Sequence, residues 1–289
     1  MQEKTKTYYQ KKVEEVLKYI HNHLGDNLNI KELAERFGIS FFHFHRILKA
    51  AIKEPLGSYI DRVRLETAIK LIRYSNDNLT NIAVQVGYSD LSSFSKAFSK
   101  EFGISPQEFK TNKEIVLNTH IDYRIDDCGT LIADLKPKIV SLPNKNVVFI
   151  RIVGKYGGEE VIEAWDNLLD LAIRNQLMNW KPDLFAIYYD DPELIEPEIC
   201  TSDYCIVVKK TIETPLNFGT QIIKGGKYAV FRYRGPYEQL WELYYSIYRN
   251  WVLFTDMKLR HSPPIERYVN YSINTKPENL LTDIYIPIE

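Results

Sequence analysis

Two segments of the sequence, fifty residues apart, each predict a helix with one face rich in hydrogen-bond donors. On the first of these faces Arg46 is the side chain with the most specific chemistry. The planar guanidinium of an arginine can donate two parallel hydrogen bonds to O6 and N7 of guanine, worth about 1–3 kcal/mol of discrimination against other bases. Lys96 holds the matching place on the second face, where a lysine acts more as a point charge. The chemistry of both faces therefore suits the major groove of duplex DNA.

Both faces belong to a repeated pattern that would position them. The segments Leu33–Pro55 and Ile82–Pro106 each contain a short amphipathic helix, a glycine, a capping side chain and a second helix, with Gly38 aligned to Gly87. Glycine accepts a left-handed backbone at little cost, so we expect each first helix to end there. The pattern predicts two helix–turn–helix motifs.

At 100° per residue, each second helix has an apolar side and a polar side. The residues expected on the buried, apolar sides are Phe41, Phe44, Ile47, Leu48, Ala51 and Ile52, and in the second copy Leu91, Phe94, Ala97, Phe98 and Phe102. The outward sides hold Phe42, Arg46, Lys49 and Lys53 with His45 at the margin, and Ser92, Ser93, Lys96, Ser99 and Lys100. Two ordinary amphipathic helices with solvated faces are the alternative, but the in-register repeat argues against it.

A resemblance to AraC/XylS-type transcription regulators lies in IAVQVGYSDLSSFSKAFSKEFGISPQEF, residues 82–109, and in LAERFGISFFHFHRILKA with the following EPLGSYIDRVRLETAIKLI. It implies two helix–turn–helix units joined by one long helix, about Leu56 to Tyr74, that read successive major grooves. RNA polymerase is an implied partner. Carried over by position, the base-reading candidates are Phe42, His45 and Arg46 with Leu91, Ser92 and Lys96. The lysines Lys49, Lys53 and Lys100 would contact phosphate.

Charge separates the two halves of the chain. Residues 1–113 hold 18 lysines and arginines against 13 acidic residues, a net of +5, whereas the remainder holds 19 against 25, a net of −6. A basic half suits a polyanionic partner, and an acidic half argues against a nucleic-acid footprint there. At 289 residues and 33.9 kDa the chain is long enough for two separately packed domains.

The second half contains its own repeat. The strand VVFIRIVGKY, Val147–Tyr156, matches YAVFRYRGPY, Tyr228–Tyr237, and a helix follows each, near Glu159–Gln176 and Tyr237–Phe254. A pair of strands follows each helix, near residues 185–189 with 204–209 and near 265–271 with 283–288. We expect a duplicated strand–helix–strand–strand fold of the α+β class, with an antiparallel sheet, helices on one face and a cleft along the pseudo-twofold axis.

This half resembles the gyrase-inhibitor-like (GyrI-like) effector-binding domain that some AraC-type regulators carry. The resemblance rests on PPIERYVNYSINTKPENLLTDIYIPI, residues 263–288, supported by RGPYEQLWELYYSIYRNWV, residues 234–252. In such domains a glutamate among aromatic side chains meets cationic, drug-like ligands, and the matching residue is Glu266. The repeat aligns Ala186 with Glu266, so the fold does not require a carboxylate there.

A carboxylate beside aromatic rings can neutralise an organic cation, and each ring face adds about 0.5–2 kcal/mol. Glu266 and Tyr268 share one face of an alternating strand. The candidate wall residues are Tyr156, Trp165, Tyr237, Trp241, Tyr244 and Tyr268, although core packing is the alternative for each. Glu266 could instead lie on the surface beside Arg267, serve as the general base of a hydrolase, or belong to a protein-binding clamp.

These observations predict a DNA-binding domain at residues 1–112, a linker at 113–134 and an effector domain at 135–289, forming a regulator that is not an enzyme. We expect no cofactor and no metal site, because the pairs His21/His23 and His43/His45 splay on helices. The acidic run Asp190, Asp191, Glu193, Glu196 and Glu198 predicts a solvated loop. A polar N-terminus, no 18-residue apolar segment and three cysteines without paired spacing predict a cytoplasmic protein without membrane contact.

Overall fold

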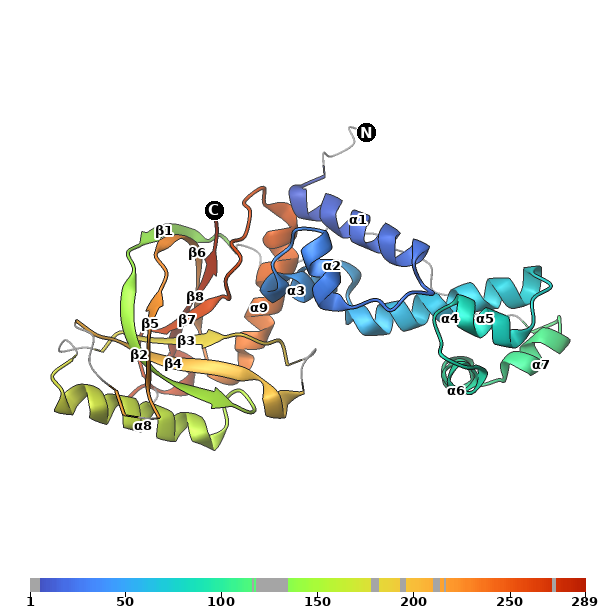
Figure 1. The fold of residues 1–289 in the computed structure, drawn as a ribbon. Coiled ribbons are helices and arrows are strands. Elements are labelled where there is room, and N and C mark those ends of the chain that lie inside the picture. Colours follow the sequence, from blue (N-terminus) through green and yellow to red (C-terminus); the bar gives the residue numbers. More distant parts are fainter. Residues whose placement is uncertain are drawn as a thin grey trace. The chain divides into compact units, whose positions relative to one another are not determined.

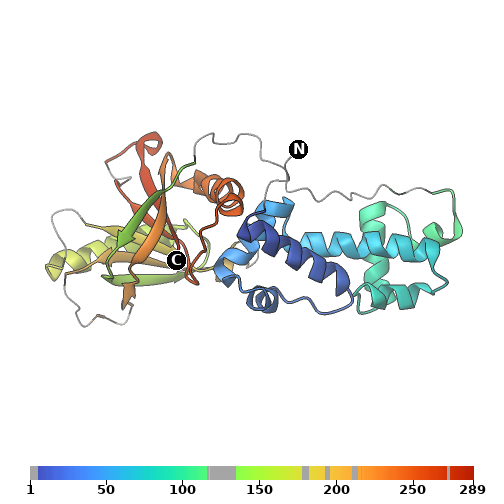
Figure 2. The same ribbon diagram turned by 90° about the horizontal axis from the view of Figure 1, so that it is seen from above.

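The computed structural model describes residues 6–115, 117, 135–177, 182–192, 196–209, 214–215, 217–271 and 274–289. Backbone contacts divide the chain into two compact units. The helical unit comprises Met1–Ile39 and Ile47–Asp127, and the sheet unit comprises Ser40–Arg46 and Cys128–Glu289. An all-α part followed by an α+β part is therefore confirmed (Figures 1 and 2). The linker predicted at 113–134 lies almost entirely outside the described residues.

Seven helices precede the sheet in the described chain. They are α1 (Tyr8–Asn22), α2 (Ile30–Arg36), α3 (Phe41–Ile52), α4 (Leu56–Tyr74), α5 (Leu79–Gln85), α6 (Leu91–Phe102) and α7 (Pro106–Thr111). The long helix predicted between the two motifs is α4, with the expected bounds. Helix α3 begins within the segment that groups with the sheet unit and continues into the helical unit.

The glycine turns form as the sequence predicts. Gly38 has φ 63° after α2, and Gly87 has φ 94° after α5, so both occupy the left-handed region. Asp90 caps α6 by accepting a hydrogen bond from the Ser93 amide at 2.7 Å. Behind α6 the rings of Phe94 and Phe98 pack at 5.6 Å between centroids. Asn78 caps α5 in the same way, by accepting from the Asn81 amide at 2.8 Å, so two caps and one aromatic core hold the second motif.

The sheet unit has eight antiparallel strands in the order β1-β6-β8-β7-β3-β4-β2-β5. They are β1 (Lys138–Leu142), β2 (Lys145–Val153), β3 (Leu184–Tyr188), β4 (Thr201–Val207), β5 (Gly219–Ile223), β6 (Gly226–Arg234), β7 (Ile265–Tyr268) and β8 (Leu281–Pro287). Helices α8 (Glu159–Arg174) and α9 (Leu240–Asn250) follow β2 and β6. Each repeat therefore has an additional first strand, β1 or β5, that the sequence pattern did not predict.

The repeats meet where β3 pairs with β7, and Ala186 lies directly opposite Glu266 in this register. Both helices cover one face, as predicted (Figure 1). Helix α8 packs on β2 and β4 and buries Leu168. In the second repeat Phe231 of β6 contacts Trp251, just after α9, at 5.3 Å between centroids. The opposite face of the sheet has its own apolar core around Phe185.

Among the described residues, none of the helices combines the length and the apolar character that crossing a membrane requires.

Candidate functional site

The predicted contact face of α6 is open. Ser92, Lys96 and Lys100 are exposed, and Leu91 is 36% exposed although periodicity predicted that it would be buried. Phe94 and Phe98, on the other side, are fully buried. Ser93 is half-buried because its amide and hydroxyl both bond to Asp90. The hydrogen-bonding groups of α6 are thus presented on one surface.

The corresponding face of α3 differs from the sequence pattern. His45, expected at the margin, is 1% exposed, while Phe42, Arg46 and Lys49 are half-buried. Phe41, expected to be buried, is 38% exposed. The reason is that residues 40–46 pack with the sheet unit, which covers the polar side chains of the first two turns of α3.

Glu266 of β7 is the central titratable group of the sheet unit. Its side chain is buried, with 3% of the residue exposed, and the Tyr268 hydroxyl donates a hydrogen bond to Oε2 at 3.1 Å. Burial raises the pKa of Glu266 to about 7, and it outweighs the hydroxyls of Tyr268 and Tyr244 and the charge of Arg46, which favour the carboxylate. Near neutral pH this site therefore holds a carboxyl group that is poised to ionise.

Aromatic rings from both repeats surround this glutamate. Tyr188 and Tyr268 are joined by a hydrogen bond between their hydroxyls at 3.1 Å, and Trp165 and Tyr237 meet Tyr268 edge-on at 5.6 and 5.3 Å. The residues of this aromatic cluster are Tyr156, Trp165, Tyr188 and Tyr204 from the first repeat and Tyr237, Tyr244 and Tyr268 from the second. Edge-to-face contacts of this kind pack the rings favourably against one another.

Five of the six predicted wall residues belong to this cluster. The exception is Trp241, which is 67% exposed on the first turn of α9 and lies outside the cluster. Tyr188 and Tyr204 were missed. Tyr188 matches Tyr268 in the internal repeat, so its position carried a signal that could have identified it.

The tyrosine hydroxyls of the cluster remain protonated at neutral pH. Burial, followed by the proximity of Glu266, raises the pKa of Tyr188, Tyr244 and Tyr268 well above the usual value. These groups therefore act as hydrogen-bond donors or neutral walls. Ionised Glu266 is the source of negative charge at the centre of the cluster.

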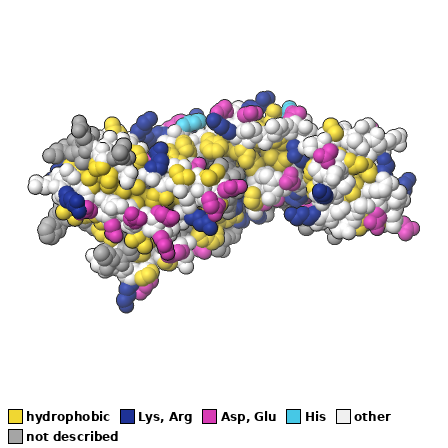
Figure 3. All heavy atoms as spheres, turned by 60° about the horizontal axis from the view of Figure 1, so that its bottom comes forward, with side chains coloured by type: hydrophobic (Ala, Val, Ile, Leu, Met, Phe, Trp, Pro, Cys, Tyr) yellow, Lys and Arg dark blue, Asp and Glu magenta, His cyan; other side chains and the backbone are white. Residues whose placement is uncertain are grey.

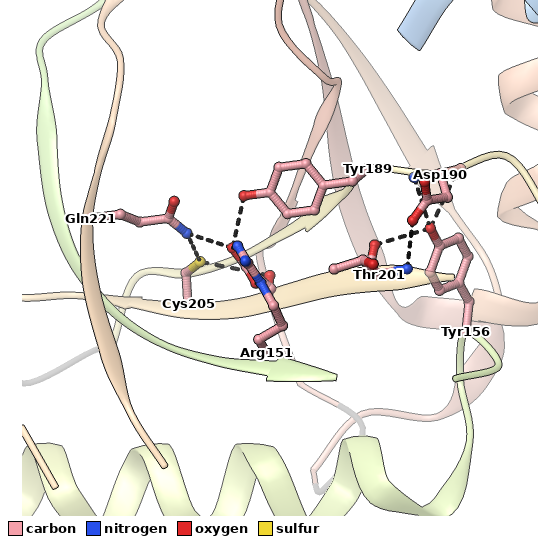
Figure 4. A network of polar contacts seen from close by, with 8 residues as sticks. Arg151, Tyr156, Tyr189, Asp190, Thr201, Cys205 and Gln221 are labelled. Atoms are coloured by element: carbon pink, nitrogen blue, oxygen red, sulfur yellow. Dashed lines mark hydrogen bonds and ion pairs between the residues drawn. The ribbon is translucent and has the colours of Figure 1, made fainter. Parts of the chain in front are cut away.

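An acidic segment after β3 borders the cluster (Figure 4). The Tyr156 hydroxyl donates to the Asp190 carbonyl at 3.1 Å, and the Thr201 amide donates to the Asp190 carboxylate at 2.7 Å. The Asp191 side chain is only 16% exposed. The prediction of a solvated loop is therefore wrong for Asp190 and Asp191, while Glu193 lies outside the described residues. The described residues contain no cluster suited to a metal ion.

A second polar network links neighbouring strands of the sheet. Arg151 binds Asp203 with two hydrogen bonds of 2.7 and 2.8 Å, and Tyr189 and Gln221 also donate to this buried carboxylate (Figure 4). The second repeat has the same pairing between Arg232 and Asp283, at 2.6 and 2.8 Å. Since each pair joins residues that are directly opposite on neighbouring strands, this network has a structural role.

The exposed surface of α8, in the sheet unit, is rich in carboxylates. Its exposed carboxylates are Glu159, Glu160, Glu163, Asp166 and Asp170. Figure 3 shows acidic side chains beside hydrophobic ones on the face that it presents. Such a surface repels a phosphate backbone.

Two profiles of known families match this chain. The GyrI-like small molecule binding domain matches residues 135–289, and a helix-turn-helix domain matches residues 33–112. The HTH-type transcriptional activator RhaS of Escherichia fergusonii is 32% identical over 102 residues, covering 35% of this chain and 37% of that protein. RhaS of Klebsiella pneumoniae is 30% identical over 106 residues, covering 37% and 38%. The chain thus spans less than two fifths of these relatives.

Solved structures each resemble part of the chain. An AraC-type transcriptional regulator from Chromobacterium violaceum is 22% identical with a TM-score of 0.34, covering 35% of this chain and 91% of that one. A hydrolase from Listeria innocua is 12% identical with a TM-score of 0.42, covering 55% and 94%. With its GyrI-like domain over more than half of its length, the chain belongs to the GyrI-like small molecule binding family, and a helix-turn-helix domain precedes that domain.

Proposed function

We propose that this protein is a DNA-binding transcription regulator whose sheet unit binds a hydrophobic organic cation at the aromatic cluster. The observation that carries the proposal is Glu266, a carboxyl group buried among aromatic rings. It makes no ion pair within the described residues. A buried carboxylate without a bound counter-charge is costly, and a cationic ligand would supply that charge. The rings would contact the apolar part of the same ligand.

The proposed DNA surface consists of the two motif faces. The open face of α6 supports it directly, because Ser92 and Lys96 are exposed while the opposite side of the helix is buried. The residues proposed to contact DNA are Phe42, His45, Arg46, Lys49, Leu91, Ser92, Ser93, Lys96 and Lys100. The relatives named RhaS, of which one is similar over 35% of this chain, are HTH-type transcriptional activators, and this likeness supports the same class of function.

The ligand part of the proposal is tested by calorimetric titration with tetraphenylphosphonium and with benzamidine. Wild-type protein should bind at least one of these cations, and Glu266→Gln should weaken that binding at least tenfold. Glu242→Gln, which removes an exposed carboxylate from α9, is the matched control and should leave affinity unchanged. Equal losses in both variants would mean that only general surface charge is involved.

The DNA part is tested by gel-shift titration with duplex fragments that wild-type protein selects from a random pool. Lys96→Ala should weaken binding and reduce its salt dependence by about one unit of slope, because one phosphate or base contact is lost. Lys18→Ala removes an equally exposed lysine from α1 and should have no effect. Retention of full affinity by Lys96→Ala would remove α6 from the proposed interface.

A hydrolase is the second candidate, and the pKa of about 7 for Glu266 favours it because a general base works best near the ambient pH. Turnover of an activated aryl ester that Glu266→Gln abolishes would establish this activity. Binding of cations without such turnover would leave the regulator as the function of the site.

A further inference from the structure

The sheet unit contains an arginine that the sequence pattern assigned to DNA. Residues 40–46 group with this unit, and within it Arg46 lies beside the acidic segment after β3. Arg46 Nη2 donates to the Asp190 carbonyl at 3.4 Å, and Nε lies 3.6 Å from Asp191 Oδ2. Only 15% of the Arg46 side chain is exposed. Nη1 also donates to the Phe42 carbonyl of the same helix at 2.7 Å. The guanidinium is therefore held by two carbonyl acceptors and by an ion pair with Asp191.

Aromatic rings complete the surroundings of this guanidinium. Arg46 Cζ lies 5.8 Å from the ring centroid of Tyr244 and 6.0 Å from that of Tyr248, within cation–π range. Tyr244 also lies beside Glu266, and the charge of Arg46 favours ionisation of that carboxyl. The chain thus already places a cation at the edge of the aromatic cluster, next to the group proposed to bind one.

Neighbouring side chains of the same segment hold this arrangement. His43 is fully buried and its Nδ1 lies 2.6 Å from the Tyr248 hydroxyl, while His45 Nδ1 lies 3.3 Å from Asp191 Oδ2. On the other side, Asp190 is fixed through Tyr156 and the Thr201 amide (Figure 4). The acceptors of Arg46 are therefore positioned before any ligand arrives.

We propose that Arg46 is a tethered competitor of the effector: its guanidinium holds the edge of the aromatic cluster until an amidinium- or guanidinium-type aromatic cation displaces it. This inference rests on the proposed function and adds the ligand class and its coupling to DNA. A ligand of this class offers the N–H donors that Asp190 and Asp191 accept and a flat π system for the tyrosines. Arg46 cannot donate to these acceptors and to a guanine at the same time, so displacement frees a base-reading side chain.

When a tethered group competes for a site, the apparent affinity of the ligand equals its intrinsic affinity multiplied by the fraction of time that the site is free. If Arg46 leaves the cluster for about a tenth of the time, its removal tightens binding about tenfold. Benzamidine titrated calorimetrically into full-length Arg46→Ala should therefore bind about tenfold more tightly than into wild type. Arg46→Gln should show a similar gain, and Lys96→Ala, whose side chain is exposed on α6, should show none.

A gel shift supplies the second readout. Benzamidine should increase the DNA affinity of wild-type protein and should have no effect on that of Arg46→Ala, which has no guanidinium to release. Unchanged or weaker benzamidine binding in both Arg46 variants, each verified as folded by its melting curve, would overturn the competition. If Glu266→Gln loses benzamidine while the Arg46 variants gain nothing, only the competition fails; if Glu266→Gln binds as wild type does, the proposed ligand role of Glu266 fails.

Discussion

Binding of an organic cation at the aromatic cluster should strengthen as the pH rises through 7. A carboxyl group with a pKa of about 7 is ionised in about a tenth of molecules at pH 6 and in about nine tenths at pH 8. If the ligand requires the carboxylate, its affinity should be roughly tenfold lower at pH 6 than at pH 8. At pH 7 about half of the Glu266 carboxyl groups are protonated before binding. Binding that requires the carboxylate should therefore release about half a proton per ligand.

The surrounding groups do not account for a dependence of this sign. The tyrosines of the cluster, with pKa values raised by burial, remain neutral between pH 6 and 8. His43 also remains neutral because burial lowers its pKa to about 3. Arg46 is charged at every pH in this range. The neutral Glu266→Gln variant should therefore bind weakly at all three pH values and lose most of the slope.

The assay is isothermal titration with benzamidine at pH 6, 7 and 8, in two buffers that differ in ionisation enthalpy. The difference in observed heat between the buffers gives the number of protons released. Wild-type affinity that stays constant from pH 6 to 8 with no proton release would refute the assignment of Glu266 as the counter-charge, because the group could not then change ionisation on binding.

Three further changes test the physical reasoning on stability. The pKa of Glu266 is 4.5 in the unfolded chain and about 7 in the folded protein. The free energy of unfolding should therefore fall by on the order of 3 kcal/mol as the pH increases from 4.5 to 7. The variant Glu266→Gln should lack this fall when unfolding by urea is measured at several pH values. Gly103→Ala should lower the free energy of unfolding by about 1 kcal/mol, and Gly87→Ala should lower it far more. Both glycines have a positive φ, but a Cβ at Gly87 would overlap the backbone oxygen of Leu24 between α1 and α2, whereas a Cβ at Gly103 would meet open space. Asp203→Ala should lower the free energy of unfolding by about 2–4 kcal/mol, more than Asp283→Ala, because Tyr189 and Gln221 lose their acceptor as well. Chemical denaturation measures the free energy of unfolding of each variant. Equal losses for the two glycine variants, or for the two aspartate variants, would contradict the contacts assigned to them.

Local patterns predicted the helical part well because its determinants are local. Helix periodicity, glycine turns and the caps Asn78 and Asp90 determine α4, α5 and α6, and each acts within a few residues of the chain. The strands β1 and β5 were missed because they are short, largely exposed edge strands in which apolar residues are adjacent in the sequence rather than alternating with polar ones. Their partners are 84 to 92 residues away in the case of β1 and 70 to 78 in that of β5, so no local signal marked the pairing.

The site was partly predictable for the same reason. Alternation along β7 placed Glu266 and Tyr268 on one face, and the repeat aligned Tyr188 with Tyr268. The contact of Arg46 with the acidic segment joins positions separated by 144 residues. Helix periodicity places Arg46 on the outward face of α3 but carries no information about which group meets that face. This contact required the three-dimensional structure.

The pairing of Ala186 with Glu266 separates what the sheet requires from what the site adds. The two residues occupy equivalent places in the repeats and lie opposite each other, both buried. The same backbone environment therefore accepts a methyl group, whereas the carboxyl group is held there with a raised pKa, a sign that the fold disfavours its charge. A buried acid that packing does not need and that burial penalises is best explained by a partner of opposite charge. Arg46 supplies part of that charge within the chain. A cationic ligand that replaces it would connect occupancy of the aromatic cluster to the availability of an arginine that we propose as a DNA contact.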